Sequence, residues 1–203
     1  MKGTASDKIC DAMLILLKEK RLDEISIKEL TALAGVNRSS YSYHFYCKED
    51  VIEAILDRFN SGLGTIFYKC FSRTDASKEV YTEVKRTVLV YYKEHIDEVK
   101  TVCASGFEGV FTRKFLLTLE ELFHQLVYTV ERDNGEKENI SSGALYDMKI
   151  KQIVHGILAA VEYWELYKFV LPVEDVISLA NEAEGLRFAG ASFKSRTGKI
   201  HMT

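Results

Sequence analysis

The chain has 203 residues, of which 47% are hydrophobic and 28% charged, and its formal net charge is −3. It is long enough to bury a sizeable core in one or two domains, and it is not a polycation as a whole. It holds a single proline and twelve glycines, which favours a mostly helical protein because few residues interrupt helices.

The N-terminal part is predicted to form three short helices. Apolar residues recur at intervals of three, four and seven between Ser6 and Lys20, which is typical of an amphipathic helix. After a polar break, Ser26 is expected to cap a second helix over residues 27–34 and to form a capping box with Glu29. The inward face of this second helix is expected to carry Ile27, Leu30 and Leu33.

A short turn joins the second helix to a third, which is predicted over residues 38–46. Gly35 is expected to end the second helix with a positive φ angle, and Asn37 to cap the third. This arrangement indicates a helix-turn-helix. Tyr41 and Phe45 are four residues apart and are predicted to face inward. The outward side is then left with short hydrogen-bonding groups, on Ser39, Ser40, Ser42, Tyr43 and His44.

The rest of the chain is predicted to form longer helices, which gives an all-α fold of about nine helices. These helices are expected over residues 48–68, 79–95, 96–104, 113–133, 144–170 and 172–183. Polar or glycine-containing segments are expected at residues 72–77, 105–109 and 134–142, and a basic tail at residues 185–203.

Charge and cysteine content bound the class of protein further. Residues 1–48 hold eight Lys and Arg against six Asp and Glu, while the remainder holds nineteen against twenty-four. A mildly basic N-terminal part permits nucleic-acid binding at that end. The four cysteines are far apart and show no C-x-x-C spacing, so we expect free thiols rather than disulfides or a metal site.

No segment is predicted to cross a membrane. The longest apolar run, residues 153–161, contains His155 and is too short to span a bilayer. The first residues lack the apolar core of a signal peptide. We therefore expect a cytoplasmic protein.

The stretch AGVNRSSYSYHFYCKE, residues 34–49, carries a family resemblance together with the helices before it. Residues 9–51 resemble the DNA-binding segment of the TetR family of bacterial transcriptional regulators. The matching positions are Ala34, Gly35, Val36, Asn37, Ser40, Tyr41, His44, Phe45, Lys48 and Glu49. The resemblance implies a helix-turn-helix DNA-binding domain over residues 1–48 and a helical effector-binding and dimerisation domain over residues 49–203.

Two details refine this resemblance. Residues 36–40, and the spacing of Gly156 to Trp164, resemble a subgroup related to activators of dihydroxyacetone metabolism. Most family members place a DNA-contacting tyrosine directly after the aromatic residue of the recognition helix, where this chain has Ser42. Either Tyr43 replaces that contact or the contact is lost.

Phosphate oxygens accept hydrogen bonds from hydroxyl, ammonium, guanidinium and helix-start N–H groups. We expect Lys48 to clamp a phosphate and Arg38 to read a guanine edge or to hold a phosphate. The full set of predicted DNA contacts is Ser26, Lys28, Asn37, Arg38, Ser39, Ser40, Ser42, Tyr43, His44 and Lys48. Ser26 has the alternative of acting only as a cap, and His44 that of packing locally.

The body is expected to supply a dimer interface and an effector pocket. The helix over residues 144–170 is apolar nearly all round, so it either packs against a second copy as well as its own domain or is wholly internal. The predicted interface residues are Gly156, Ala159, Ala160 and Trp164. The predicted pocket residues are Phe67, Phe71, Tyr91, Phe107, Phe111, His124, Tyr128 and His155.

The leading hypothesis is a repressor that binds palindromic double-stranded DNA as a homodimer and responds to a small-molecule or protein effector. The alternatives are an activator of the same family controlled by a protein partner, and a ligand-sequestering helical protein without DNA binding. An enzyme is not expected, because the sequence holds no H-E-x-x-H, G-x-S-x-G or phosphate-loop motif. No cofactor is expected.

Overall fold

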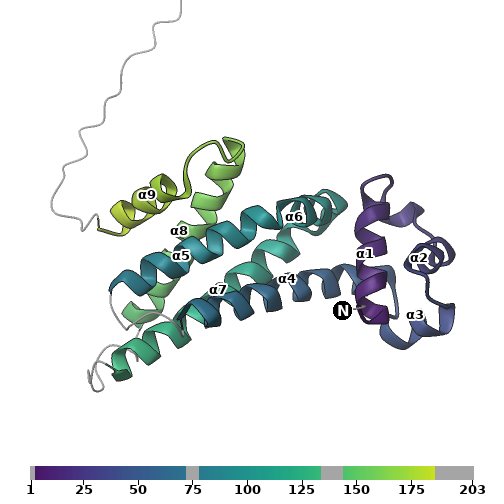
Figure 1. Ribbon diagram of the computed structural model, residues 1–203, viewed down its shortest axis with the longest axis horizontal. Helices are drawn as coiled ribbons and strands as arrows, with labels where there is room; N and C mark the ends of the chain where they lie inside the picture. The colour runs from purple at the N-terminus through teal and green to yellow at the C-terminus, as the bar shows by residue number, and fades with distance from the viewer. Residues whose placement is uncertain (1–2, 72–77, 134–143, 186–203) are drawn as a thin grey trace, which may run out of the picture.

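The computed structural model describes residues 3–71, 78–133 and 144–185. Over these residues it contains nine α-helices, α1 to α9, and no strand, which confirms the predicted all-α fold. Figure 1 shows a small head made of α1, α2 and α3 at one end of the molecule and a longer helical body beside it. The predicted segments 72–77 and 134–142 and the tail beyond residue 185 lie outside the described residues.

Local capping interactions place the head's helices, α1 (Ala5–Leu17), α2 (Ile27–Ala34) and α3 (Arg38–His44). The Ser26 hydroxyl accepts a hydrogen bond from the Glu29 N–H at 3.2 Å, as predicted for a helix cap. Gly35 ends α2 with φ of 63°, a left-handed conformation that costs glycine little. The Asn37 side chain then accepts from the Ser40 N–H and caps α3.

The inward face of α2 differs from the prediction at one position. Leu33 is exposed, and Thr31 is buried. The packed stripe of α2 has spacings of three, four and seven residues, and Leu33 falls outside it. The stripe consists of Ile27, Leu30, Thr31 and Ala34. The Thr31 hydroxyl donates to the Ile27 carbonyl at 2.9 Å, so its burial leaves no polar group unpaired.

The body consists of α4 (Lys48–Phe71), α5 (Lys78–Glu94), α6 (Ile96–Val102), α7 (Glu108–Asp133), α8 (Ala144–Leu166) and α9 (Val173–Gly185). Helix α4 begins in the head, where it packs on α1, and continues into the body between α5 and α7 (Figure 1). Helices α8 and α9 pack on α5 from the other side. None of the helices in the described residues combines the length and the apolar character needed to cross a membrane.

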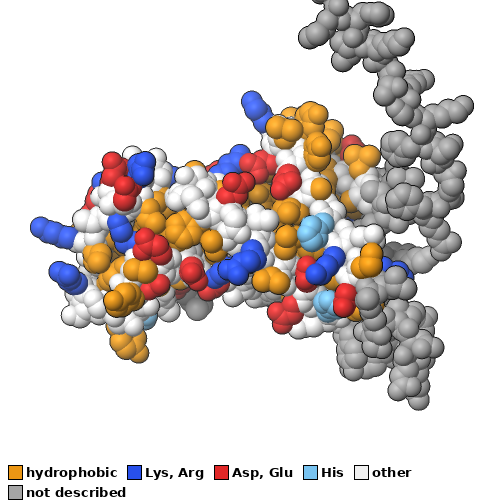
Figure 2. All heavy atoms as spheres, turned by 180° about the vertical axis from the view of Figure 1, so that it is seen from behind, with side chains coloured by type: hydrophobic (Ala, Val, Ile, Leu, Met, Phe, Trp, Pro, Cys, Tyr) orange, Lys and Arg blue, Asp and Glu red, His pale blue; other side chains and the backbone are white. Residues whose placement is uncertain are grey.

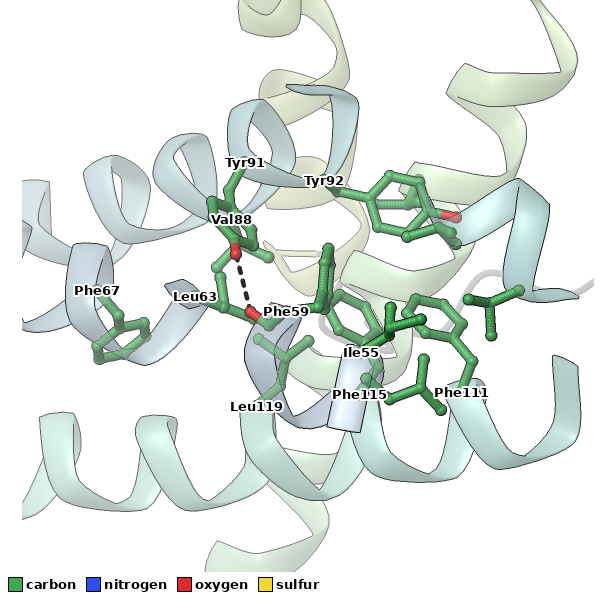
Figure 3. Packing of buried hydrophobic residues seen from close by; sticks show 14 of the residues in the cluster. Ile55, Phe59, Leu63, Phe67, Val88, Tyr91, Tyr92, Phe111, Phe115 and Leu119 are labelled. Atoms are coloured by element: carbon green, nitrogen blue, oxygen red, sulfur yellow. Dashed lines mark hydrogen bonds between the residues drawn. The ribbon is translucent and has the colours of Figure 1, made fainter. Parts of the chain in front are cut away.

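Aromatic rings fill the centre of the body. The Phe59 ring of α4 lies 5.6 Å from Phe111 and 6.1 Å from Phe115 of α7, measured between ring centroids. The Tyr91 hydroxyl of α5 donates to the Phe59 carbonyl at 2.9 Å, the dashed line in Figure 3. These contacts join α4, α5 and α7 into one core.

Two helix boundaries differ from the predicted ones by four residues or more. A π-helical turn, η2 (Cys103–Phe107), connects α6 to α7, and Gly106 within it has φ of 93°. This turn allows α7 to begin at Glu108, five residues before the predicted start. Helix α8 ends at Leu166, four residues before the predicted end.

Candidate nucleic-acid interface

Helix α3 separates an inward from an outward side, as predicted. Tyr41 and Phe45 are 2% and 7% exposed and belong to the core of the head. Arg38, Ser39, Ser42, Tyr43 and His44 are all exposed, and Ser40 is half-buried. The outward side of α3 therefore presents a guanidinium group, hydroxyl groups and an imidazole to solvent.

Two tyrosines project furthest from this region. Tyr43 is 84% exposed, and its ring meets the His44 ring edge to face at 5.0 Å. Tyr46 is 96% exposed and was not among the predicted contacts. The Asp50 carboxylate accepts hydrogen bonds from the N–H groups of Tyr46 at 2.8 Å and Cys47 at 3.1 Å, which fixes the turn that carries Tyr46.

A signal for this turn was present in the sequence. An aspartate in the first turn of a helix is a strong acceptor for N–H groups just before it, and Asp50 stands four residues after Tyr46. The same hydrogen bonds, led by the one from the Cys47 backbone, hold the pKa of Asp50 below its usual value. The carboxylate is thus charged at neutral pH and keeps the turn in place.

The remaining predicted contacts of the head lie beside α3. Ser26 and Lys28 are exposed at the start of α2, although the Ser26 hydroxyl already accepts the capping bond. The Asn37 Oδ1 atom accepts from the Ser40 N–H at 2.7 Å, so only its amide N–H groups remain for another partner.

Lys48 is placed differently from the prediction. Its ammonium group donates hydrogen bonds to the backbone carbonyls of Leu22, Asp23 and Ile25, and the last of these is 2.8 Å long. These carbonyls belong to the 3₁₀ turn η1 (Leu22–Glu24) and the residue after it. All three ammonium protons therefore have partners inside the head, and this arrangement does not favour the predicted phosphate clamp.

The predicted effector residues differ in burial. Phe67, Tyr91 and Phe111 belong to the buried core, and Phe107 is half-buried. His155 is exposed, and its Nδ1 atom lies 2.8 Å from the Lys151 carbonyl oxygen.

Of the other predicted pocket residues, the structure describes the side chain of His124. His124 is half-buried, and its ring packs 5.2 Å from the Tyr146 ring. The side chains of Phe71 and Tyr128 lie outside the described part of the structure. A single pocket lined by this set stays a prediction, and the burial of Phe67, Tyr91 and Phe111 in the core does not favour it.

The predicted interface residues divide into two groups. On α8, Gly156 and Ala159 are exposed and Ala160 is half-buried. Trp164 is buried inside its own chain, where its Nε1–H donates to the Leu171 carbonyl at 2.8 Å and its ring meets Phe169 edge to face. The place of Trp164 in a dimer interface stays a prediction, and its burial within one chain does not favour it.

Comparison with known proteins agrees with this architecture. No family model matches the sequence. The chain is 27% identical over 141 residues to YxbF of Bacillus subtilis, described as an uncharacterised HTH-type transcriptional regulator. The match covers 66% of this chain and 36% of YxbF, so it spans about a third of that protein. It is 24% identical over 144 residues to YttP of the same species, a probable HTH-type regulator, with 68% of each chain covered.

Comparison with solved structures identifies the fold. A putative TetR-family regulator from Syntrophomonas wolfei matches with a TM-score of 0.68 at 17% identity, covering 89% of this chain and 93% of that one. The dihydroxyacetone kinase operon activator DhaS matches at 0.58 and 15% identity, and a TetR regulator from Streptococcus agalactiae at 0.56 and 19%, each with the same coverage. The chain has the TetR fold. Within this fold, α2 and α3 form the helix-turn-helix, and α4 connects the head to the body.

Proposed function

We propose that the protein is a TetR-like transcriptional regulator that binds palindromic operator DNA as a homodimer. The observation that carries the proposal is the outward side of α3, where five exposed side chains donate or accept hydrogen bonds while Tyr41 and Phe45 anchor the helix. A short helix held at two buried points fits into a major groove as a rigid body.

The exposed groups of the head suit contacts both to base edges and to the sugar–phosphate backbone of DNA. Arg38 is able to pair with a guanine edge, and Lys28 at the start of α2 suits a phosphate. Tyr43 and Tyr46 both end in a hydroxyl group that reaches beyond the helix, and we assign them to the sugar–phosphate backbone. Tyr43 thereby replaces the contact that a tyrosine at the Ser42 position makes in the resembling family.

One helix-turn-helix reads few base pairs, so the proposal includes a second copy of the chain. Exposed apolar side chains occur along α8, the turn after it and α9: Met148, Tyr163, Leu166, Tyr167, Val170, Leu171 and Leu179. Hydrophobic side chains gather at the end of the body that carries the α8–α9 turn (Figure 2). An apolar surface of this kind favours a protein–protein contact, and Gly156 and Ala159 on α8 permit close approach of a second helix.

We further propose that an effector bound by the body changes the affinity for DNA. The coupling free energy expected for such regulation is about 1–3 kcal/mol. Repression is the usual outcome for the resembling family. An activator controlled by a protein partner is the alternative, and the structural likeness to the activator DhaS is the observation in its favour.

Fluorescence anisotropy with DNA from beside the gene of this protein tests the proposal. We expect tight binding at low salt that weakens steeply as salt is raised, because phosphate contacts release counterions. The variants Arg38→Ala and Tyr43→Ala should weaken binding, whereas Arg113→Ala, an exposed cation on α7, should not. Binding that is absent at every salt concentration, or equally strong in all three variants, contradicts the proposal.

A further inference from the structure

A cavity of about 370 Å³ lies between α4, α5 and the start of α6. Its volume is within the range of small-molecule sites. It is lined by Arg58, Phe59, Gly62, Thr65, Ile66, Tyr91, His95 and Glu98. Of the residues predicted to bind an effector, Tyr91 alone is among them.

One side of the cavity is apolar and aromatic. Phe59 and Ile66 come from α4, and the Tyr91 ring of α5 lies 5.1 Å from the Phe59 ring. The Tyr91 hydroxyl passes beside Gly62 and donates to the Phe59 carbonyl (Figure 3). The tyrosine therefore presents its ring to the cavity rather than its polar end. This wall suits the hydrocarbon or aromatic body of a ligand.

The polar groups lie at the end nearer the head. The Arg58 guanidinium is 2.7 Å from the Asp11 carboxylate of α1 and 3.7 Å from the Glu98 carboxylate of α6. The His95 ring packs against the Tyr91 ring at a tilt of 30°, with 4.0 Å between the ring centroids, and its Nδ1 atom lies 2.9 Å from the Tyr91 carbonyl oxygen. If Nδ1 carries the proton that this carbonyl accepts, Nε2 is the ring nitrogen left to meet a ligand.

We propose that this cavity binds a small organic carboxylate with an apolar body, and that the ligand's carboxylate takes Arg58 away from Asp11. A guanidinium group matches a carboxylate with two parallel hydrogen bonds, whereas the Arg58–Glu98 contact is beyond hydrogen-bond distance. Asp11 is an exposed partner, with 63% of its side chain accessible, and ion pairs of this kind contribute little. A ligand that holds Arg58 with two hydrogen bonds and packs its apolar body on Phe59 and Tyr91 therefore competes well against it.

The same exchange connects the cavity to the head. Asp11 belongs to α1, which packs against α2 and α3 in the head, while Arg58 and Glu98 belong to the body. A ligand that binds only when Arg58 has left Asp11 favours conformations in which this link between head and body is open. This regulatory consequence rests on the proposed function, whereas binding of the carboxylate does not.

Calorimetric titration of the full chain with phenylbutyrate, phenylbutanol and phenylbutylamine tests the site, because the three probes differ only in their polar end. We expect phenylbutyrate to bind more tightly than the amine, because the carboxylate pairs with Arg58, whereas an ammonium group can meet only the Glu98 carboxylate and is repelled by Arg58. Arg58→Gln should weaken the binding of phenylbutyrate about tenfold or more, as expected for the loss of hydrogen bonds to a charged group. Asp11→Asn should tighten it, because the competing carboxylate is gone.

Lys114→Gln is the matched control. Lys114 of α7 also pairs with two carboxylates of α4, Asp57 at 2.7 Å and Glu53 at 3.4 Å, but it does not line the cavity. Its loss should leave the affinity for phenylbutyrate unchanged, and thermal unfolding checks that each variant is folded. Preferred binding of the amine, no binding of phenylbutyrate up to its solubility limit, or unchanged affinity in Arg58→Gln overturns the proposal.

The link to the head is measured separately, by DNA affinity with and without phenylbutyrate. We expect phenylbutyrate to change DNA affinity in the parent protein and much less in Asp11→Asn, where the link is already open. DNA binding without any phenylbutyrate binding contradicts this inference alone. Phenylbutyrate binding without DNA binding contradicts the proposed function and leaves the carboxylate site standing.

Discussion

Gly62 of α4 and Tyr91 of α5 approach so closely that a Cβ atom at Gly62 would stand 2.2 Å from the Tyr91 hydroxyl oxygen. The absence of a side chain at Gly62 allows Tyr91 to cross over α4 and to bond to the Phe59 carbonyl. Burial raises the pKa of this tyrosine to about 12, so the hydroxyl remains a donor at neutral pH.

Gly62→Ala should therefore lower the free energy of unfolding by about 1–3 kcal/mol, the usual range for overpacking a core. Gly64→Ala is the control on the same helix, because a Cβ atom there meets nothing within 4 Å. It should stabilise the protein by up to about 1 kcal/mol, since alanine is the better helix former. Denaturant unfolding measures both; equal effects of the two changes would contradict the described packing.

Lys48 is predicted to stabilise the head rather than to bind DNA. Lys48→Met removes the donor that serves three carbonyls, and it should cost about 1–3 kcal/mol of unfolding free energy. The exposed Lys28→Met should cost little stability but reduce the slope of DNA affinity against salt by about 1. If Lys48→Met instead reduced the slope of DNA affinity against salt and left stability unchanged, Lys48 would bind a phosphate as the sequence predicted.

Trp164 is predicted to act within one chain. Trp164→Phe removes the hydrogen bond to the Leu171 carbonyl and weakens the contact with the Lys93 ammonium group, which lies 5.0 Å from the ring centroid. The unfolding free energy should fall by about 1–2 kcal/mol, while the dissociation constant of the dimer stays unchanged. A weaker dimer with unchanged thermal stability of the monomer would place Trp164 in the interface after all.

Stability should fall in alkaline solution, partly because of two thiols, of which Cys10 is buried and Cys103 is half-buried. Burial raises the pKa of Cys10 and of Cys103 from 9.0 to about 11. The unfolded chain therefore loses these protons at lower pH than the folded chain, and the contribution to stability is present below pH 9.0 and lost towards pH 11.

Cys103→Ala isolates one of these groups. Denaturant unfolding at both ends of that pH range should show a smaller loss of stability in the variant than in the parent. An identical pH dependence in the two proteins would mean that Cys103 titrates as it does in the unfolded chain.

The head was predictable because local interactions define it. Ser26, Gly35 and Asn37 each act on residues within four positions, and the spacing of Tyr41 to Phe45 fixes the inward side of α3. Thr31 in place of Leu33 shows the limit of such reasoning. Residues two apart lie on different sides of a helix, and the contacts with α1 and α3 decide which side is buried.

Contacts between distant segments were not predictable in the same way. Lys48 meets carbonyls 23 to 26 residues earlier, and no local pattern marks them. The position of Trp164 depends on the end of α8, where Lys168 and Phe169 take positive φ angles of 53° and 56° that are uncommon for such residues. The cavity beside Arg58 also joins distant segments. Its α4 residues fall at helical spacing, but no local pattern shows that Tyr91, His95 and Glu98 lie opposite them.

Footprinting of a bound DNA site by hydroxyl radicals, with the number of chains in the complex counted by native mass spectrometry, tests the central claim most directly. We expect two chains on one duplex and two protected half-sites about 10 base pairs or a multiple of that distance apart on one face. The double variant Arg38→Ala with Tyr43→Ala should lose both protected patches together. Protection that survives in this variant, or a single chain bound to a single patch, would contradict DNA reading by the outward side of α3.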